Sequence, residues 1–583
     1  MLKHFILTLL LARFAFAGGG PENVVVVVNE DSDASKAIAD EYVRLRNIPP
    51  INVISLRDLP NIEQVDIDTF RDKILQPVLD AIDKRGLKPQ IDYVAYSADF
   101  PWAIDARNDV KGTKLPRALT PTGSLNGLTY LYQRVLAKDG SYLQLNSNRY
   151  MRRPIRSVNR KPVEPDDQKR YAEAAAELKQ EKWTEAAAIL ATLTKKYPQQ
   201  AGLHYNLACC LARQDKLDEA MTSLSAAVDS GWFNRKHTEA DEDLTALRER
   251  EDFKKLLDKM DERRNAPFQV QPTHAFHAQT QWNPQGDVVD EGGEKYLLST
   301  MLAVTSGRGN TVEESIESLR RSVRADASQP DGTIYYMVNG NIRSKTREPA
   351  FLSAVTALKK LNIKAEINDG ILPKEKADVA GAMIGTASFN WDASKSKIMP
   401  GAICEHLTSF GGVMREGAGQ TPLTEFLRHG AAGASGTVTE PLAIQNKFPF
   451  AFLHVHYARG CSLAEAFYQS VYCPYQLLIV ADPLCQPWAK PVKVVVEGVT
   501  DGNKISGEIA ISPKTEGQED SVQRFELFVD GIRKQTCQPG KQLVLDSENL
   551  ANGSHELRII SIGSSAIEFQ NRAIVSIVVD NSE

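Results

Sequence analysis

The sequence predicts a multidomain protein with one α/β domain, one α-helical domain and one β domain. The α/β domain is an open, mostly parallel sheet, interrupted by inserted helical repeats and followed by a β-sandwich. Three observations lead to this prediction. Apolar β-branched runs alternate with amphipathic helical segments on either side of an alanine-rich region, that region repeats after 34 residues, and the chain ends in short alternating strands. Because 583 residues exceed what one hydrophobic core supports, several domains are expected.

The first part of the α/β sheet is predicted within residues 18–165. Its opening run, "NVVVVVNE" at 23–30, is almost continuously apolar, as in parallel strands that helices cover on both faces. Further strands are predicted at 51–56 and 91–97, with a helical segment over about 65–86 between them. Strands and helices in alternation indicate right-handed parallel crossovers.

A helical insertion is predicted over residues 166–265, after a basic, proline-punctuated linker at 149–170. Within it, "EKWTEAA" at 181–187 recurs as "DKLDEAM" at 215–221. Three further pairs share this 34-residue offset: Ala174 and Ala208, Ala186 and Ala220, Leu190 and Leu224. Small residues at helix contacts with this period are typical of tetratricopeptide repeats. Such repeats form concave surfaces that bind other proteins, so we expect a protein partner.

The α/β alternation resumes in residues 266–490, which makes the repeats an insertion into one α/β domain or a bridge between its halves. Strands are predicted at 333–338, 363–367, 378–385, 401–409, 431–439 and 476–483, and helices at 311–323, at 421–429 and within 447–471. Residues 491–583 have a different pattern. Short alternating strands with tight turns at Asp530-Gly531 and Asn552-Gly553 predict a β-sandwich of immunoglobulin-like type.

The N-terminus predicts export. Residues 1–17 combine Lys3, an apolar run at 5–12 and the sequence Ala15-Phe16-Ala17, which is the layout of a secretory signal cleaved after Ala17. We therefore expect the protein in the periplasm, outside the cell or at the cell surface. No later apolar run reaches the roughly 18 residues that a membrane span needs, so no membrane span is expected.

Composition and motifs argue against several ligands. A net charge of −5 shows no large excess of one sign, so nucleic acid is not an expected partner. The seven cysteines contain no CxxC pair, which argues against a cysteine-rich zinc site. No P-loop, GxSxG, HExxH or dinucleotide-binding glycine motif occurs in its required context, so neither a metal nor a cofactor is expected.

One segment resembles a catalytic site. "GAICEHLTSFGG" at 401–412 holds Cys404, Glu405 and His406 in succession. Side chains alternate along a strand, so Cys404 and His406 share one face and Glu405 the other. Because helices are expected to cover this strand on both faces, the pattern favours a buried structural role for the cysteine and the histidine.

The carboxyl ends of parallel strands are the expected place for functional side chains. At these ends, or next to them, the sequence offers two sets of candidates. The candidates for catalysis are Ser409, Thr408, Glu440, Asp99 and His406. The candidates for binding are Trp102, Thr386, Ser388, Trp391 and Asp482.

Three stretches carry a resemblance to known proteins: "ADVAGAMIGTASFNWDASKSKIMPGAICEHLTSFGG", "TEFLRHGAAGASGTVTEP" and "SLAEAFYQSVYCPYQLLIVADPLCQPWA". They resemble the core of gingipain-type cysteine peptidases, which have a caspase-like fold. Together with "PENVVVVVNEDSDASKAIADEYVRLRNIPPINVI", they resemble still more a bacterial family of exported proteins. That family's function is not assigned, and its species distribution associates it with exosortase-type protein sorting. The resemblance covers roughly residues 21–150 and 270–490.

The resemblance bears directly on catalysis. In the peptidases, a His-Gly pair ends one strand and a cysteine ends the next, so that the histidine activates the thiol. On this sequence, the His-Gly position falls at about Thr386-Ala387, and the cysteine position falls at about Thr408 or Ser409. Neither member of the dyad is present, and Cys404 lies too early, within the strand.

Three functions follow from these observations. The first is an exported, non-catalytic, peptidase-like protein that binds other proteins through its repeats and its β-sandwich. The second is a hydrolase with an altered site that uses Ser409 or Thr408. The third is a protein that binds cell-surface carbohydrate through the C-terminal sandwich and the tryptophans near strand ends.

Overall fold

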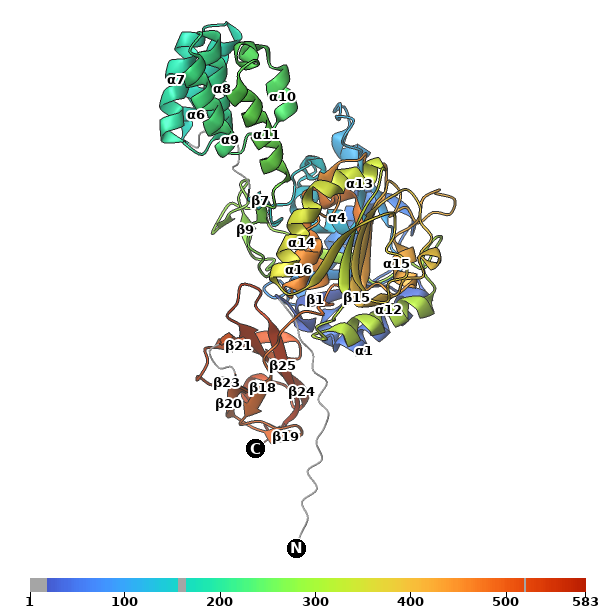
Figure 1. Cartoon of the computed structure of the whole chain (residues 1–583). Helices are drawn as coiled ribbons and strands as arrows, with labels where there is room; N and C mark the ends of the chain where they lie inside the picture. Colours follow the sequence, from blue (N-terminus) through green and yellow to red (C-terminus); the bar gives the residue numbers. More distant parts are fainter. Residues whose placement is uncertain (1–17, 156–163, 518–520, 583) are drawn as a thin grey trace. The chain divides into compact units, whose positions relative to one another are not determined.

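The structure is a computed structural model that describes residues 18–155, 164–517 and 521–582. The predicted signal segment, residues 1–17, lies outside the described residues. The chain divides into two compact units, one formed by residues 1–152 and 272–583 and the other by residues 153–271 (Figure 1).

The first unit is built on a ten-stranded sheet with the order β13-β12-β14-β15-β16-β17-β11-β4-β1-β2. Its strands, in chain order, are β1 (Val24–Asn29), β2 (Val53–Leu56), β4 (Tyr93–Tyr96), β11 (Leu298–Met301), β12 (Thr333–Val338), β13 (Lys364–Asp369), β14 (Val379–Gly385), β15 (Ile398–Leu407), β16 (Gly433–Thr437) and β17 (Leu477–Ala481). The prediction of a large, mostly parallel sheet in a mixed α/β fold is confirmed.

The sheet joins the two halves of the chain directly. Strand β1 lies between β2 and β4, and all three run parallel, with every residue of β1 buried. Strand β11 pairs with β4 in parallel, from Leu298 opposite Tyr93 to Met301 opposite Tyr96. Residues after 272 therefore extend the sheet that residues before 152 begin, and residues 153–271 are inserted between neighbouring strands.

The direction of β17 changes the position of one predicted site residue. Strand β17 is antiparallel to β16, with Gly433 opposite Ala481 and Thr437 opposite Leu477. Asp482 follows β17, so it lies at the edge of the sheet where β16 begins. The expectation that Asp482 joins the carboxyl ends of β14, β15 and β16 therefore does not hold.

Helices cover the sheet on both faces. They are α1 (Asp33–Arg46), α2 (Ile67–Phe70), α3 (Gln76–Lys84), α4 (Leu125–Tyr130), α5 (Tyr132–Ala137), α12 (Val312–Ala325), α13 (Ile342–Arg347), α14 (Phe351–Lys360), α15 (Thr424–Arg428), α16 (Leu453–Ala458) and α17 (Leu463–Ser470). Helices α1 and α12 lie side by side, and so do α14 and α16 (Figure 1). The capping box predicted at Thr311 and Glu314 is present at the start of α12.

The helix predicted within 447–471 is divided into α16 and α17. Gly460 has φ of +98°, a left-handed conformation that ends a helix and favours glycine. Ser462 and Glu465 then form a capping box that starts α17. A continuous apolar pattern across this break made the two short helices look like one long helix.

The second unit is helical. It contains α6 (Pro165–Lys179), α7 (Trp183–Lys196), α8 (Ala201–Arg213), α9 (Leu217–Asp229), α10 (Arg235–Ala240) and α11 (Glu251–Asn265), with the short strands β7 (Pro154–Ile155) and β8 (Gln269–Val270) paired at its base. The four alanines of the 34-residue repeat, Ala174, Ala186, Ala208 and Ala220, are fully buried between the helices. The described part of the predicted linker is structured, because α6 begins at Pro165 and residues 149–152 are buried.

Two sheets form the C-terminal part of the first unit, and a common core lies between them. One sheet is β18-β20-β23 and the other is β19-β25-β24-β21-β22. Their strands are β18 (Val494–Glu497), β19 (Asn503–Ile505), β20 (Glu508–Thr515), β21 (Val522–Val529), β22 (Ile532–Cys537), β23 (Leu543–Asp546), β24 (Gly553–Gly563) and β25 (Gln570–Val579).

The remaining strands are short. They are β3 (Gln64–Asp66), β5 (Ala103–Asp105) and β6 (Thr122–Ser124), which form a three-stranded sheet, and β9 (Gln281–Trp282) and β10 (Val288–Val289), which form a pair. Within the part of the chain that the structure describes, no helix is both long and apolar enough to span a membrane.

Candidate functional site

His406 lies in a closed aromatic environment on β15. Its side chain is 0% exposed, and its ring centroid lies 5.3 Å from that of Phe389 and 5.5 Å from that of Phe426. Burial lowers the pKa of His406 to about 3, although the backbone at Thr421 lies near enough to favour the charged form. Neither ring nitrogen makes a hydrogen bond of normal geometry. The imidazole is therefore neutral, and no acidic side chain in the described part of the chain forms a hydrogen bond that would orient it as a general base.

The neighbours of His406 also have structural surroundings. Cys404 is 0% exposed, and burial raises the pKa of its thiol far above the ordinary value, so the reactive thiolate is not formed. Glu405 accepts hydrogen bonds from the backbone N–H of Ser435 (3.0 Å) and from its hydroxyl (2.7 Å). Burial raises the pKa of Glu405 to about 7, and Arg347, at 3.9 Å, acts in the opposite direction.

A hydrogen-bonded loop closes the end of β15, where the resemblance places the peptidase cysteine. The hydroxyl of Thr408 donates to Oε1 of Gln420, and the backbone N–H of Phe410 donates to the same oxygen at 3.0 Å. Arg308, which follows β11, donates to the carbonyls of Phe410 (3.0 Å) and Val413 (3.1 Å from Nε). Thr408 and Ser409 are only 1% and 8% exposed, so this edge is a packed loop closure.

The two acidic candidates likewise have other partners. Asp99 accepts hydrogen bonds from the hydroxyls of Ser32 (2.6 Å) and Thr305 (2.7 Å), which ties the loop after β4 to the loops after β1 and β11. Glu440 accepts a hydrogen bond from the backbone N–H of Leu442 at 2.7 Å. Among the hydrogen bonds of the described residues, none joins a candidate nucleophile to a candidate base, which is the contact that nucleophilic catalysis requires.

The residues predicted to bind a ligand are mostly buried. Trp102 and Trp391 are 3% and 1% exposed, and the indole N–H of Trp391 donates to the carbonyl of Ser396 at 3.0 Å. Neither tryptophan offers the exposed ring face that a sugar needs for stacking. The hydroxyl of Thr386 donates to the carbonyl of Ser388 at 3.0 Å, which makes a local turn at the end of β14.

Asp482 belongs to a buried ion cluster. It pairs with Arg46 at the end of α1, and it accepts a hydrogen bond from the hydroxyl of Tyr42 at 3.0 Å. Arg46 also pairs with Asp326, which follows α12. Burial raises the pKa of Asp326 to about 7, and Arg46 opposes this effect. The cluster connects the ends of two helices, which is a structural role.

The helical unit presents a groove between α7, α8 and α9. The groove has a volume of about 520 Å³, and its floor includes Ala187, Leu207 and Leu211, each at least nine-tenths buried. Polar side chains form the rim: Thr184, Gln214, Lys216, Glu219, Thr222 and Ser223. An apolar floor with a polar rim is the usual construction of a peptide-binding groove.

A second groove lies beside the first, between α9 and α11. It has a volume of about 740 Å³ and shares Thr222 with the first groove. Met221 and Leu256 contribute apolar surface. Charged residues surround them, including two ion pairs, Arg250 with Asp218 (2.8 Å) and Lys259 with Asp229 (3.0 Å). Helix α9 therefore separates an apolar groove from a charged one.

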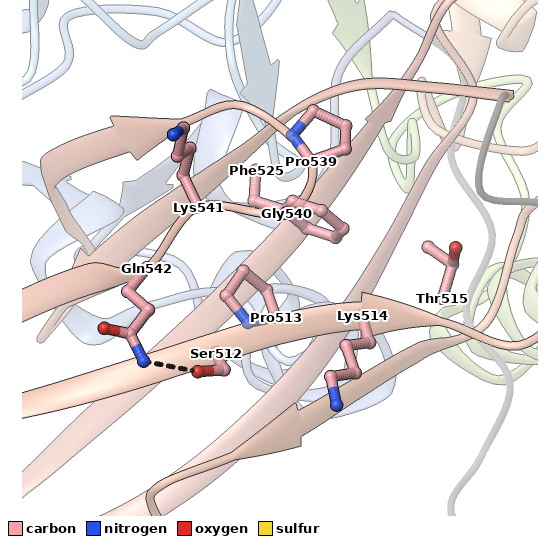
Figure 2. A pocket seen from close by; sticks show the side chains of 9 residues that line it. All are labelled: Ser512, Pro513, Lys514, Thr515, Phe525, Pro539, Gly540, Lys541 and Gln542. Atoms are coloured by element: carbon pink, nitrogen blue, oxygen red, sulfur yellow. Dashed lines mark hydrogen bonds between the residues drawn. The ribbon is translucent and has the colours of Figure 1, made fainter.

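The C-terminal sheets carry a smaller polar pocket of about 480 Å³ (Figure 2). Phe525 and Pro513 provide apolar surface, and the amide of Gln542 donates to the hydroxyl of Ser512 at 3.0 Å. Two exposed lysines, Lys514 and Lys541, line the pocket as well.

One group of possible metal ligands occurs among the described residues. Cys209, Asp241 and Asp243 place one donor atom each within 4.8 Å of one another. The groups already have other partners, since Tyr205 donates to Asp241 at 2.6 Å and Arg213 lies 3.7 Å from Asp243. Burial raises the pKa of the Cys209 thiol, which disfavours the thiolate that would bind a metal. We assign no metal to this group.

Arg308 and Gln420 carry no signal in the sequence, because their role depends on loops that meet only in the folded chain. The residues that line the groove could have been predicted from the sequence. The 34-residue offset aligns α6 with α8 and α7 with α9, and the residues that face outward between them can be counted from the buried alanines.

Comparisons with known proteins support the assignment of the helical unit. Residues 171–235 match the tetratricopeptide repeat family. The predicted tetratricopeptide repeats are thereby confirmed. The chain is also similar to a chloroplastic protein of Arabidopsis thaliana, with 34% identity over 70 residues, which is 12% of this chain and 21% of that protein. The match therefore covers about a fifth of that relative's length.

Two solved structures show weaker similarity. One is of the fibronectin(III)-like modules of Clostridium thermocellum CbhA, with 13% identity, coverage of 15% of this chain and 94% of that chain, and a TM-score of 0.13. The other is of an endo-beta-1,4-mannanase from Thermotoga petrophila, with 11% identity, coverage of 21% and 24%, and a TM-score of 0.13. TM-scores this low carry no argument about fold or function.

Proposed function

We propose that this chain is an exported, non-catalytic protein that binds a protein partner through its tetratricopeptide unit. The α/β domain is a peptidase-like scaffold of the caspase and gingipain type, and the C-terminal sheets form an immunoglobulin-like module. The protein acts in the periplasm, outside the cell or at the cell surface. The predicted signal segment supports export, and the confirmed repeats support a protein partner.

The groove between α7, α8 and α9 carries the proposal. Leu207 and Leu211 on α8 give it an apolar floor, and Lys216 and Glu219 on the rim carry opposite charges. Such a groove fits a segment of another protein that inserts apolar side chains and forms hydrogen bonds at the rim. The rim has no excess of one charge, so recognition depends on shape and apolar contact more than on net charge.

Site-directed filling of the groove tests the proposal. Ala188 is exposed on α7 and lines the groove, so Ala188→Arg places a long charged side chain in it while leaving the buried alanines unchanged. Thr192→Arg, at an exposed position on the same helix outside the lining, adds the same charge and serves as the control. Peptides selected from a displayed random library on the full chain are titrated against all three proteins.

Three outcomes decide the test. We expect the Ala188→Arg chain to bind the selected peptides at least about 10-fold more weakly, while the Thr192→Arg chain binds them as the unchanged chain does. Equal affinity for the Ala188→Arg chain would show that the groove is not the binding site. Failure to select any peptide would refute peptide recognition by this chain.

A second candidate function rests on the pocket in Figure 2. Two exposed lysines, with hydroxyl and amide groups nearby, fit an acidic saccharide. Phe525 is 2% exposed, so recognition would depend on these polar and charged groups and not on ring stacking. The buried tryptophans give this function no support. Titration with acidic and neutral oligosaccharides tests it: Lys541→Ala weakens binding of the acidic sugar, and a chain that binds neither sugar contradicts this second function.

A further inference from the structure

Three consecutive glycines, Gly18, Gly19 and Gly20, follow the predicted cleavage position at Ala17, and all three are buried. A Cβ atom added at Gly18 would lie 2.0 Å from Oε1 of Glu465, and one added at Gly19 would lie 2.5 Å from the ring of Tyr93. A Cβ at Gly20 would lie 2.0 Å from Arg572. A side chain at any of the three positions would force these neighbouring groups to shift, so the glycines pass through a narrow slot.

Glu465, one wall of this slot, is a carboxylate buried with little compensating charge. It is 0% exposed, and it accepts hydrogen bonds from the backbone N–H groups of Phe276 and Ser462, each at 2.8 Å. Burial raises the pKa of Glu465 to about 7. His277 is the basic side chain that lowers the pKa of Glu465, and its effect is smaller than that of the hydrogen bonds.

His277 is itself engaged elsewhere. It forms an ion pair with Glu568 at 3.2 Å, and the carboxylate of Asp92 also acts on it. The imidazolium therefore faces two other acids. A buried carboxylate normally has a cation or a metal beside it, since the desolvation of an unpaired charge is costly. A further positive charge next to Glu465 would thus offset the cost of burying its carboxylate.

The backbone nitrogen of Gly18 lies where such a charge would act. It donates to the carbonyl of Ile567 at 3.0 Å. Because N and Cβ of one residue are about 2.5 Å apart, the nitrogen lies within about 4.5 Å of Oε1 of Glu465. Opposite charges at that separation stabilise each other strongly when both are buried. An amide at this position, however, carries no net charge.

We propose that the slot is a binding site for the chain's own α-amino group at Gly18. Hydrolysis of the Ala17–Gly18 peptide bond by an export peptidase adds water across the bond. It leaves a carboxylate on Ala17 and an amino group on Gly18, which takes up a proton from solvent. The resulting ammonium pairs with Glu465 and donates to Ile567. This inference rests on the export that forms part of the proposed function.

The pair connects two parts of the first unit. Glu465 belongs to α17, which packs against the central sheet, while Ile567 lies between β24 and β25 of the C-terminal sheets. An N-terminus held by both joins the C-terminal sheets to the α/β domain. Processing therefore stabilises the mature chain over the unprocessed chain, and the three glycines allow the backbone to pass close to Glu465, Tyr93 and Arg572.

Chains with defined N-termini test the proposal. One chain begins at Gly18 with a free amine, and the other retains Ala15, Phe16 and Ala17, so that its amine lies three residues away. Both are released from a removable fusion, and their unfolding rates in urea are compared. We expect the chain that begins at Gly18 to unfold at least about 10-fold more slowly, because its ammonium compensates Glu465.

Glu465→Gln is the deciding variant. The single amide oxygen of glutamine can keep the capping-box bond from Ser462, while the bond from the N–H of Phe276 and the negative charge are lost. Both N-terminal forms lose that bond equally, so the difference between them should disappear. Glu314→Gln, in the exposed capping box of α12, is the matched control and should leave the difference unchanged. Equal unfolding rates for the two N-termini, or a difference that persists in Glu465→Gln, would overturn the proposal.

The N-terminal sequence of the exported protein tests whether cleavage occurs at the position that the proposal requires. A mature chain that begins at Gly18 supports it. A chain that begins at any other residue overturns it together with the predicted cleavage. Partner binding by the groove is tested independently, since Ala188→Arg and Thr192→Arg lie in the other unit.

Discussion

Replacing His406 with leucine should stabilise the protein. The imidazole is fully buried between Phe389 and Phe426, and both of its nitrogens lack hydrogen bonds of normal geometry. Each buried polar atom without a partner costs about 1–3 kcal/mol. Leucine has a similar volume and no polar atom. We therefore expect His406→Leu to raise the free energy of unfolding at pH 7 by about 1–3 kcal/mol.

The effect should grow as the pH falls. The pKa of His406 is about 3 in the folded chain and 6.5 in the unfolded chain, so between these values the unfolded chain binds more protons. Acid therefore destabilises the unchanged protein through this residue, by about 2 kcal/mol between pH 7 and pH 5. His406→Leu removes this contribution, so its advantage should increase by the same amount.

Urea unfolding at pH 7 and pH 5, followed by tryptophan fluorescence, measures both effects. Ile403→Val, at a buried position on the same strand, is the control and should cost about 0.5–1.5 kcal/mol equally at both values of pH. The reasoning fails if His406→Leu lowers stability at pH 7, or if its difference from the unchanged chain is the same at both values of pH.

Three further predictions concern other parts of the chain. Although burial acts to raise the pKa of Glu22, two arginines, Arg558 among them, lower it below 4.5. Glu22→Gln should therefore cost about 3–5 kcal/mol at pH 7. Urea unfolding should show this loss shrinking as the pH falls below about 4.5, where the carboxyl of the unfolded chain protonates, until the lower pKa of the folded chain is passed. Cys404 should resist iodoacetamide in the folded chain while the partly exposed Cys537 reacts, and mass spectrometry showing Cys404 modified first would contradict its structural role. Ala220→Leu should destabilise the helical unit by about 1–3 kcal/mol in urea unfolding, because the alanine is fully buried against neighbouring helices, and an unchanged transition would contradict that packing.

Local periodicity explains what the sequence could predict. A strand places alternate side chains on opposite faces, so the opposite orientations of His406 and Glu405 followed from their adjacency. In the structure His406 packs against Phe426 of α15, while the Glu405 carboxylate lies beside Arg347 of α13. The repeat period likewise placed Ala174 and Ala208 at equivalent helix contacts, because such contacts require small residues.

Features that depend on distant pairing were out of reach. The direction of β17 follows from its antiparallel pairing with β16, and it places Asp482 at the edge opposite the ends of β14, β15 and β16. The closure of the β15 edge requires Arg308 to reach carbonyls of a loop about a hundred positions later in the chain. The slot around Gly18 involves Glu465 and Ile567, which no local pattern connects to the N-terminus.

The most direct test of the central claim is crosslinking from the groove itself. A photoreactive amino acid is placed at Ser223, on the rim, and separately at Thr192, outside the groove on α7. Each full chain is irradiated with the exported proteins of the source cells, and the adducts are identified by mass spectrometry. The account predicts one specific adduct from position 223 that is absent from position 192 and is lost when Ala188→Arg fills the groove. Adducts that are the same from both positions, or that survive Ala188→Arg, would contradict partner binding in the groove.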